Sequence, residues 1–417
     1  MGNAQSPPSD PLFLSASRSF TQKELEDLNS LFRSLAEQSG SGGKFITLPV
    51  FQAYFSVLGP LGSRLFHLVT QKRNDQQLTF EDLIIAKGTY EKGSREEVEE
   101  FINQLVDVNG DGILDRSDLE VVLKSTLEAV FTPKAAEAVN NLDYSIIEVF
   151  LHAAKFSKEG SSMSYEDFKN WCNLIPSVRK FLGNLLLPLD PGSGGCHLPQ
   201  LLCPEDFSPD LLVLRKEYAW HISGALSQKE TEEWRLLYHS SVHGLSFNTF
   251  LGNLQNAEGP TIMLIKDKEG FIYGGYASLP WERHSDFYGD MKSFLFSLYP
   301  HAAIFRPTGS NGNLQWCAVN FTSESIPNGL GFGGRANHFG LFISASFDHG
   351  HTFTCSTFDN PCLSKQDKIY PEIIECWGVM EKGGEQEKFD SVKGTILERF
   401  KEDRNMLNMV GLANASE

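Results

Sequence analysis

Hydrophobic positions in the first half of the chain recur every three to four residues, which is the spacing of one face of an α-helix. The first such segment begins near Thr21, because Thr21 and Glu24 have the spacing of a capping box and apolar residues follow at helical intervals through Leu35. Residues 1–19 instead are rich in Ser and Pro and lack periodicity, which predicts a disordered N-terminus. We therefore predict an all-α domain over residues 20–187.

The second half of the chain has short apolar runs separated by turns, a pattern typical of β-strands. Strands are predicted over residues 261–265, 271–276, 293–297, 303–305, 315–319, 340–347 and 373–379. A helix is predicted over 227–238, where Ser227 and Glu230 have capping spacing and Trp234 and Leu237 follow. Consecutive strands with short connections favour an antiparallel two-sheet sandwich over βαβ units.

Residues 188–205 separate the two halves, because they combine four prolines with a Gly-Ser-Gly-Gly run. At the other end, residues 385–409 carry a single apolar stripe, which predicts a charged helix that docks on its own domain or in a partner's groove. The predicted fold class is α+β. The predicted order is a disordered N-terminus (1–19), a helical domain (20–187), a linker (188–205), a β-rich domain (206–380) and a C-terminal helix and tail (381–417).

The clearest candidate chemistry is the stretch Asp-Val-Asn-Gly-Asp-Gly-Ile-Leu-Asp-Arg-Ser-Asp at residues 107–118. It matches the EF-hand calcium loop, with a glycine at position 6 where the chain must turn sharply. The expected ligands at positions 1, 3, 5, 7, 9 and 12 are Asp107, Asn109, Asp111, the backbone carbonyl of Ile113, Asp115 through water, and Asp118.

Position 12 of this loop departs from the usual pattern, which has a bidentate Glu there. Asp118 is one methylene shorter, so ligation through both oxygens requires the loop to close further. We therefore expect one weak calcium site that also tolerates magnesium. The alternatives are an acidic turn that binds nothing and a purely structural lobe.

Alignment of other segments to this loop identifies three further copies of the helix-loop-helix unit. Their residues at the apolar position 8, which is Leu114 in this loop, are Ile46, Leu78 and Met163. Their early positions cannot cage a divalent ion, since they hold residues such as Gln71, Arg73, Asp75, Phe156, Lys158 and Gly160. We predict four helix-loop-helix units in two pairs, with one ion at most. An unrelated helical bundle is the alternative.

Composition narrows the function classes. Acidic residues (53) exceed Lys plus Arg (36), and the net charge of −17 argues against a nucleic-acid binder. Seven scattered cysteines without a Cys-x-x-Cys pair indicate a reduced intracellular protein. Cys196-His197 with Cys203 lacks a fourth zinc ligand, and we interpret that grouping as coincidence. No apolar run approaches the length needed to span a bilayer. We predict a cytoplasmic protein.

The N-terminus carries a candidate lipidation signal. Gly2 and Ser6 have the spacing of an N-myristoylation site, whereas Pro7 is unfavourable for it. One myristoyl chain gives reversible membrane binding only. The expected localisation is therefore cytoplasmic and, if Gly2 is acylated, peripheral on a membrane.

Other motifs support enzymatic chemistry poorly. The glycines at 329–334 are followed by a strand instead of the helix that a dinucleotide fingerprint requires. His349 and His351 have the spacing of metal ligands on a strand, yet surface histidines are more common. A hydrolase would pair Cys355 or Ser241 with His243 and an acid such as Asp348, without a nucleophile elbow. We predict a protein that is not an enzyme.

Residues of the second half also match a known domain in order along the chain. They are Glu-Trp-Arg-Leu-Leu-Tyr (233–238), Val-His-Gly-Leu-Ser-Phe (242–247), Gly-Gly-Tyr-Ala (274–277) with Trp281, Ser-Phe-Leu-Phe (293–296), Ile-Pro-Asn-Gly-Leu-Gly-Phe-Gly-Gly (326–334), Phe-Gly-Leu (339–341) and Glu-Cys-Trp-Gly-Val (375–379). Over about 206–380 the chain resembles a TLDc domain. The whole arrangement is similar to the mTOR-associated branch of TLDc proteins and its plant relatives.

This resemblance implies a two-sheet sandwich flanked by helices and brings no established catalytic residues. It also implies roles in oxidation resistance and in lysosomal or vacuolar signalling. The implied partners are the vacuolar-type proton ATPase and mTOR-type signalling components. Together with the loop at 107–118, it favours a calcium-modulated adaptor. The alternative function is an enzyme of oxidative defence with its site near residues 338–362.

Overall fold

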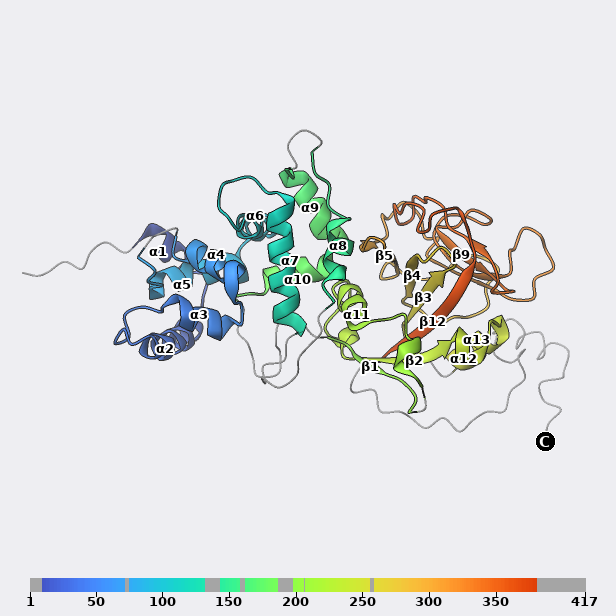
Figure 1. The fold of residues 1–417 in the computed structure, drawn as a ribbon, viewed down its shortest axis with the longest axis horizontal. Coiled ribbons are helices and arrows are strands. Elements are labelled where there is room, and N and C mark those ends of the chain that lie inside the picture. Colours follow the sequence, from blue (N-terminus) through green and yellow to red (C-terminus); the bar gives the residue numbers. More distant parts are fainter. Residues whose placement is uncertain are drawn as a thin grey trace, which may run out of the picture. The chain divides into compact units, whose positions relative to one another are not determined.

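The computed structural model describes residues 10–71, 75–131, 143–157, 162–186, 198–205, 207–255 and 259–380. The chain divides into two compact units, Met1–Cys196 and His197–Glu417, which are drawn from blue to red along the sequence in Figure 1. Several predicted features lie outside the described residues: Gly2, the helix at 385–409, the Cys196-His197 pair, Arg73, Lys158 and Gly160.

The first unit is helical, as its hydrophobic spacing predicts. Its helices are α1 (Pro11–Ser17), α2 (Gln22–Gln38), α3 (Leu48–Phe55), α4 (Gly59–Val69), α5 (Phe80–Lys87), the π-helix η1 (Gly88–Lys92), α6 (Arg95–Val106), α7 (Arg116–Phe131), α8 (Ser145–Leu151), α9 (Tyr165–Leu174) and α10 (Pro176–Gly183). The predicted capping box starts α2: the Glu24 amide donates to the Thr21 hydroxyl (3.2 Å), and the Thr21 amide donates to the Glu24 carboxylate (2.6 Å). Capping boxes also start α5 and α6.

The loops of this unit meet in pairs at the predicted register. Ile46 and Leu78 exchange backbone hydrogen bonds of 2.9 and 3.0 Å, and the Met163 amide donates to the Leu114 carbonyl at 2.7 Å. All four side chains are buried. Because each contact joins residues at position 8 of two loops, the structure supports the repeat over an unrelated bundle.

The prediction of disorder over residues 1–19 is wrong for the described residues 10–19. Pro11–Ser17 forms α1, whose first turn is capped by the Asp10 carboxylate accepting the Leu12 amide at 2.8 Å. Phe13 and Ala16 pack against a buried cluster of Phe20, Leu28 and Ile84. The apolar face is too short to show periodicity, and tertiary packing stabilises it.

Within its described residues, the second unit contains two sheets. The larger has the strand order β1-β2-β12-β3-β4-β5-β6 and the smaller β11-β10-β9-β8-β7. The strands are β1 (Gln200–Leu202), β2 (Glu233–His239), β3 (Thr261–Asp267), β4 (Ile272–Ala277), β5 (Phe294–Tyr299), β6 (Ala303–Phe305), β7 (Gln315–Ala318), β8 (Gly329–Phe332), β9 (Leu341–Ser344), β10 (Gly350–His351), β11 (Lys368–Ile369) and β12 (Pro371–Met380). The β1–β2 pair is parallel and the remaining pairs are antiparallel, which confirms the predicted α+β class.

Short helices accompany these sheets: η2 (Pro209–Leu211), α11 (Lys216–Ser223), η3 (Lys229–Thr231), α12 (Ser240–His243) and α13 (Phe247–Leu254). The predicted strands correspond to β3, β4, β5, β6, β7, β9 and β12. Figure 1 shows β12 running along β3 in the middle of the larger sheet.

The helix predicted over 227–238 is wrong. Glu230 does accept from the Ser227 amide at 3.0 Å, but the helix that follows is only the single 3-10 turn η3, whose N-cap is Gln228. The chain then enters β2, where Trp234, Leu236 and Tyr238 alternate as buried residues between β1 and β12. Alternation with period two is a strand signal, and pairing on both sides outweighs the local capping pattern.

The predicted linker 188–205 is also too long at its C-terminal end, because Gln200–Leu202 forms β1 and pairs with β2. The sequence pattern did not predict β1, because this strand has only three residues. It did not predict β8 either, because two of its four residues are glycines. Those glycines permit close approach: a Cβ on Gly329 would lie 2.1 Å from the Ile343 carbonyl oxygen. A Cβ on Gly275 of β4 would lie 2.6 Å from the Phe332 ring of β8, so the two sheets pack face to face there.

Candidate metal centre

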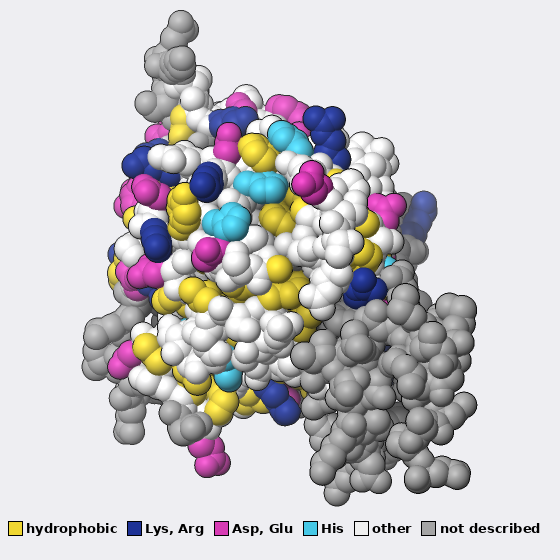
Figure 2. Space-filling model, turned by 90° about the vertical axis from the view of Figure 1, so that its right-hand side faces the viewer, with side chains coloured by type: hydrophobic (Ala, Val, Ile, Leu, Met, Phe, Trp, Pro, Cys, Tyr) yellow, Lys and Arg dark blue, Asp and Glu magenta, His cyan; other side chains and the backbone are white. Residues whose placement is uncertain are grey.

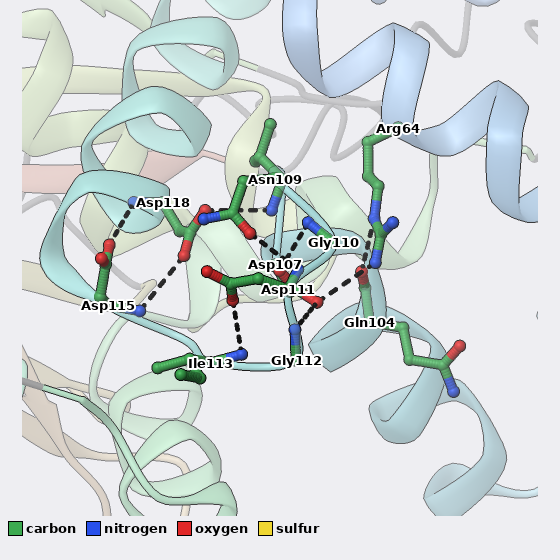
Figure 3. A network of polar contacts seen from close by, with 11 residues as sticks. Arg64, Gln104, Asp107, Asn109, Gly110, Asp111, Gly112, Ile113, Asp115 and Asp118 are labelled. Carbon is green, nitrogen blue, oxygen red and sulfur yellow. Dashed lines mark hydrogen bonds and ion pairs between the residues drawn. The ribbon is translucent and has the colours of Figure 1, made fainter.

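The acidic loop at 107–118 connects α6 to α7 in the first unit (Figure 3). Gly110 and Gly112 have φ of +75° and +81°, a region that L side chains rarely adopt. Gly112 is at position 6 of the loop, so the chain turns sharply where the motif requires a glycine. The Ile113 side chain is exposed and has no ligating atom, so only its backbone carbonyl is suited to ligation.

Backbone amides organise the first half of the loop. Asp107 accepts the Gly110 amide through Oδ1 at 2.9 Å and the Gly112 amide through Oδ2 at 3.2 Å. Asn109 accepts the Asp111 amide at 2.8 Å, and Asp111 accepts the Ile113 amide at 2.7 Å. These bonds fix the side chains of Asp107, Asn109 and Asp111 against the backbone of the turn.

The second half of the loop is closed by Asp115 and Asp118. Asp115 Oδ1 accepts the amides of Ser117 (2.8 Å) and Asp118 (3.1 Å), which caps the start of α7. The two oxygens of Asp118 each accept an amide at 3.2 Å, one from Val108 and one from Asp115. Asp118 thus joins the beginning of the loop to its end.

The electrostatics of the loop favour a cation. Burial raises the pKa of Asp118, and the nearby charges of Asp115 and Asp107 raise it further. The hydrogen bond from the Asp118 amide lowers the pKa of Asp115, and this effect is larger than that of burial, which raises the pKa. The donors are all oxygens, which hard cations such as Ca²⁺ and Mg²⁺ prefer. Within the residues that the structure describes, however, no three His, Cys, Asp or Glu side chains converge as a metal site. In this conformation, therefore, the predicted ligand side chains do not form a preassembled site.

Arg64 is a functional candidate that the sequence pattern missed. Its Nη2 lies 3.3 Å from Asp107 Oδ2, and its Nε donates to the Gln104 carbonyl at 3.0 Å (Figure 3). Arg64 is on α4, forty-three positions before Asp107, so no spacing rule connects the two residues. The packing of α4 beside the loop brings the Arg64 cation to Asp107, the first of the predicted ligands.

The second unit has a buried polar centre around Glu375 of β12, which is fully buried together with His239 of β2. Glu375 accepts the amides of Val213 and Leu214 and the Trp377 indole N–H (2.9 Å). His239 Nε2 lies 3.5 Å from the same carboxylate and 3.1 Å from the Leu211 carbonyl. This carboxylate fastens the segment that follows η2 to the larger sheet.

Residues 211–380, which include both sheets except for β1, match the family described as the TLDc domain. This part of the chain is a TLDc domain. Its relatives include the mTOR-associated protein MEAK7 of Danio rerio, 35% identical over 256 residues that make up 58% of this chain and 55% of the relative. The rat oxidation resistance protein 1 is 32% identical over 144 residues, or 34% of this chain and 16% of the relative.

The human nuclear receptor coactivator 7 is similar over the same length, with 33% identity over 34% of this chain and 14% of its own. The chain thus spans about half the length of the MEAK7 relative and a small part of the other two.

No helix in the described ranges is long and apolar enough to cross a membrane.

Several histidines of the TLDc domain contact aromatic rings. The His338 ring stacks on Phe353 with centroids 4.2 Å apart, and His351 stacks on Phe342 at 5.1 Å. Burial, followed by the charges of neighbouring histidines, lowers the pKa of His351 to about 4. Figure 2 shows histidine side chains gathered among hydrophobic ones on one face. His349 instead pairs with Asp348 at 2.6 Å.

The residues considered for a hydrolase have other partners. The buried Cys355 donates to Asn360 Oδ1 at 3.0 Å, and His243 Nδ1 accepts the His239 amide at 3.0 Å. The His243 ring also stacks on Tyr238 at 5.6 Å. In the described TLDc domain, the contacts of Cys355 and His243 are therefore those of packed residues.

Proposed function

We propose that this chain is a non-enzymatic regulator in which the TLDc domain binds a protein partner and the helical unit modulates that binding. The proposal rests mainly on the match of residues 211–380 to the TLDc domain. The names of its relatives associate one with mTOR and another with oxidation resistance. We place this chain in the same kind of mTOR-associated or oxidative-stress regulation.

The proposed partner is the vacuolar-type proton ATPase, with mTOR-type signalling components as further partners. The TLDc family resemblance supports this choice. Purified vacuolar proton ATPase mixed with the full-length chain tests it by co-sedimentation. We expect the chain to sediment with the enzyme complex. A chain that stays in the supernatant at every concentration tested would refute this partner.

The proposed regulator is one calcium ion, or magnesium in its place, held at the loop by Asp107, Asn109, Asp111, Asp115, Asp118 and the Ile113 carbonyl. The all-oxygen donor set and the left-handed turn at Gly112, position 6 of the loop, support this proposal. Titration calorimetry of the full-length chain should show binding heat with calcium, and Asp111→Ala should abolish it. Absence of heat with both ions in the unsubstituted chain would refute ion binding.

The proposed location is cytoplasmic, with peripheral attachment to lysosomal or vacuolar membranes through an N-myristoyl group on Gly2. The first residues of the sequence support this proposal, while Pro7 opposes it. Metabolic labelling with a myristate analogue should label the full-length chain and leave Gly2→Ala unlabelled. Equal labelling of both proteins would exclude Gly2 as the acylated residue.

Five of the described thiols are poor candidates for the reactive group of an enzyme of oxidative defence. Burial raises the pKa of Cys203, Cys317, Cys362 and Cys376 and raises that of Cys172 to about 12. A raised pKa disfavours the thiolate, which is the reactive form. Replacing Cys355, His349 and His351 together by alanine tests the alternative. An enzyme with its site there would lose its protective activity in cells and keep its partners, whereas a regulator would keep both.

A further inference from the structure

We propose that Arg64 is an internal cation that competes with a divalent ion for the first ligand of the loop at 107–118. The inference rests on the proposed ion binding and adds a residue outside the loop that sets its affinity. It also connects the loop to α4, a helix of the preceding helix-loop-helix unit.

The contacts of Arg64 are directed at the loop and at the helix before it. Nη2 lies 3.3 Å from Asp107 Oδ2, the oxygen that also accepts the Gly112 amide. Nε donates to the Gln104 carbonyl at 3.0 Å, near the C-terminal end of α6, where a positive charge is favourable. One guanidinium therefore binds both the first ligand and the helix that presents it.

Burial makes this pair stronger than a typical surface ion pair. The side chains of Arg64 and Asp107 are 11% and 12% exposed. Charges are screened less in such surroundings than in water, so a nearby second cation is repelled more strongly. Gly110 leaves room for the arginine, because a Cβ there would lie 2.6 Å from Nη1.

A divalent ion at the loop would add two positive charges beside this guanidinium and would attract the same carboxylate. The ion must therefore displace Arg64 from Asp107 or bind against its repulsion. In the first case, ion binding releases the contact between α4 and the loop. In the second case, the affinity stays low. Both outcomes make Arg64 a determinant of affinity.

Arg116 provides a matched control. It occupies position 10 of the same loop, carries the same charge, and pairs with Glu148 at 2.6 Å instead of with a predicted ligand. If only the overall positive charge near the loop mattered, Arg116→Gln and Arg64→Gln would have equal effects. If contact with Asp107 matters, Arg64→Gln has the larger effect.

The test is titration calorimetry of the metal-free full-length chain with calcium chloride and then with magnesium chloride. We expect Arg64→Gln to bind calcium on the order of tenfold more tightly than the unsubstituted chain, and Arg116→Gln to change affinity by less than about threefold. Binding heat in Arg64→Gln alone would also support the inference, and it would refute calcium regulation of the natural chain.

Other outcomes separate the two proposals. Calcium binding with equal affinity in all three proteins would overturn the role of Arg64 and leave the ion site standing. No heat in any protein would refute the ion site and the inference with it. If Arg64→Gln does not fold, Arg64→Lys serves instead: lysine keeps the charge but cannot make both contacts, so we expect calcium affinity to rise about threefold. Unchanged affinity in Arg64→Lys would then overturn the inference.

Discussion

Glu375→Gln tests whether the buried carboxylate of the TLDc domain holds the segment after η2 on the larger sheet. Glutamine has nearly the same shape as glutamate but replaces one acceptor oxygen by an NH₂ donor. The side chain is fully buried, so water cannot replace a lost partner. The substitution therefore isolates hydrogen bonding and charge from packing.

The magnitude follows from the contacts. Oε2 accepts both the Leu214 amide (3.2 Å) and the Trp377 indole N–H (2.9 Å), while Oε1 accepts the Val213 amide. An NH₂ group at either position leaves one or two buried donors unsatisfied, at about 1–3 kcal/mol each. We expect a loss of about 2–4 kcal/mol, which in a domain of this size lowers the Tm by roughly 4–16 °C.

Thermal and urea unfolding of the full-length chain, followed by tryptophan fluorescence, measure this loss. Glu372→Gln is the matched control, because Glu372 is on the same strand, is half exposed and pairs with Lys266 on the surface at 3.0 Å. It should change stability by less than about 0.5 kcal/mol. Equal Tm values for the two variants would refute the account of Glu375.

Three further predictions concern single residues. Burial lowers the pKa of His221 to about 3, whereas an unfolded histidine titrates near 6.5. The unfolded state therefore binds the proton first, and the protein loses stability as the pH falls below 6.5. In urea unfolding, His221→Phe should lose about 2 kcal/mol less stability between pH 6.5 and 5 than the unsubstituted chain, and an equal pH dependence of the two proteins would contradict this. Asp118→Glu should restore bidentate ligation and raise calcium affinity about tenfold in calorimetry, so weaker binding would show that the loop cannot accept the longer side chain. Gly274→Ala should cost about 2–4 kcal/mol in urea unfolding because its Cβ would lie 1.9 Å from the Met263 carbonyl oxygen, while Gly312→Ala, with open space around it, serves as the neutral control.

The helical unit was predictable where local signals and the repeat agreed. The capping box at Thr21 and the pairing of position-8 residues follow from spacing alone. The helix at 11–17 could not be predicted, because seven residues show too little periodicity. It is stabilised by packing against Phe20 and Ile84, which local sequence does not reveal. Arg64 was unpredictable for the same reason, since its role depends on where α4 packs.

The TLDc domain shows a different limit of sequence reasoning. Its longer strands were visible as apolar runs, and its family was recognisable from ordered short motifs. The segment at 227–238 misled because the contact between Ser227 and Glu230 precedes only a single 3-10 turn, after which the chain enters β2. Glu375 gave no signal of its own, because an acidic residue in a strand is usually exposed and only its distant partners show why it is buried.

The most direct test of the central claim is the affinity of the full-length chain for purified vacuolar-type proton ATPase, measured in excess calcium and in chelator. The proposed regulator binds in at least one condition, its affinity differs between the two, and Asp111→Ala removes that difference. Binding of equal strength with and without calcium would contradict modulation by the loop. No binding in either condition would contradict the adaptor role itself.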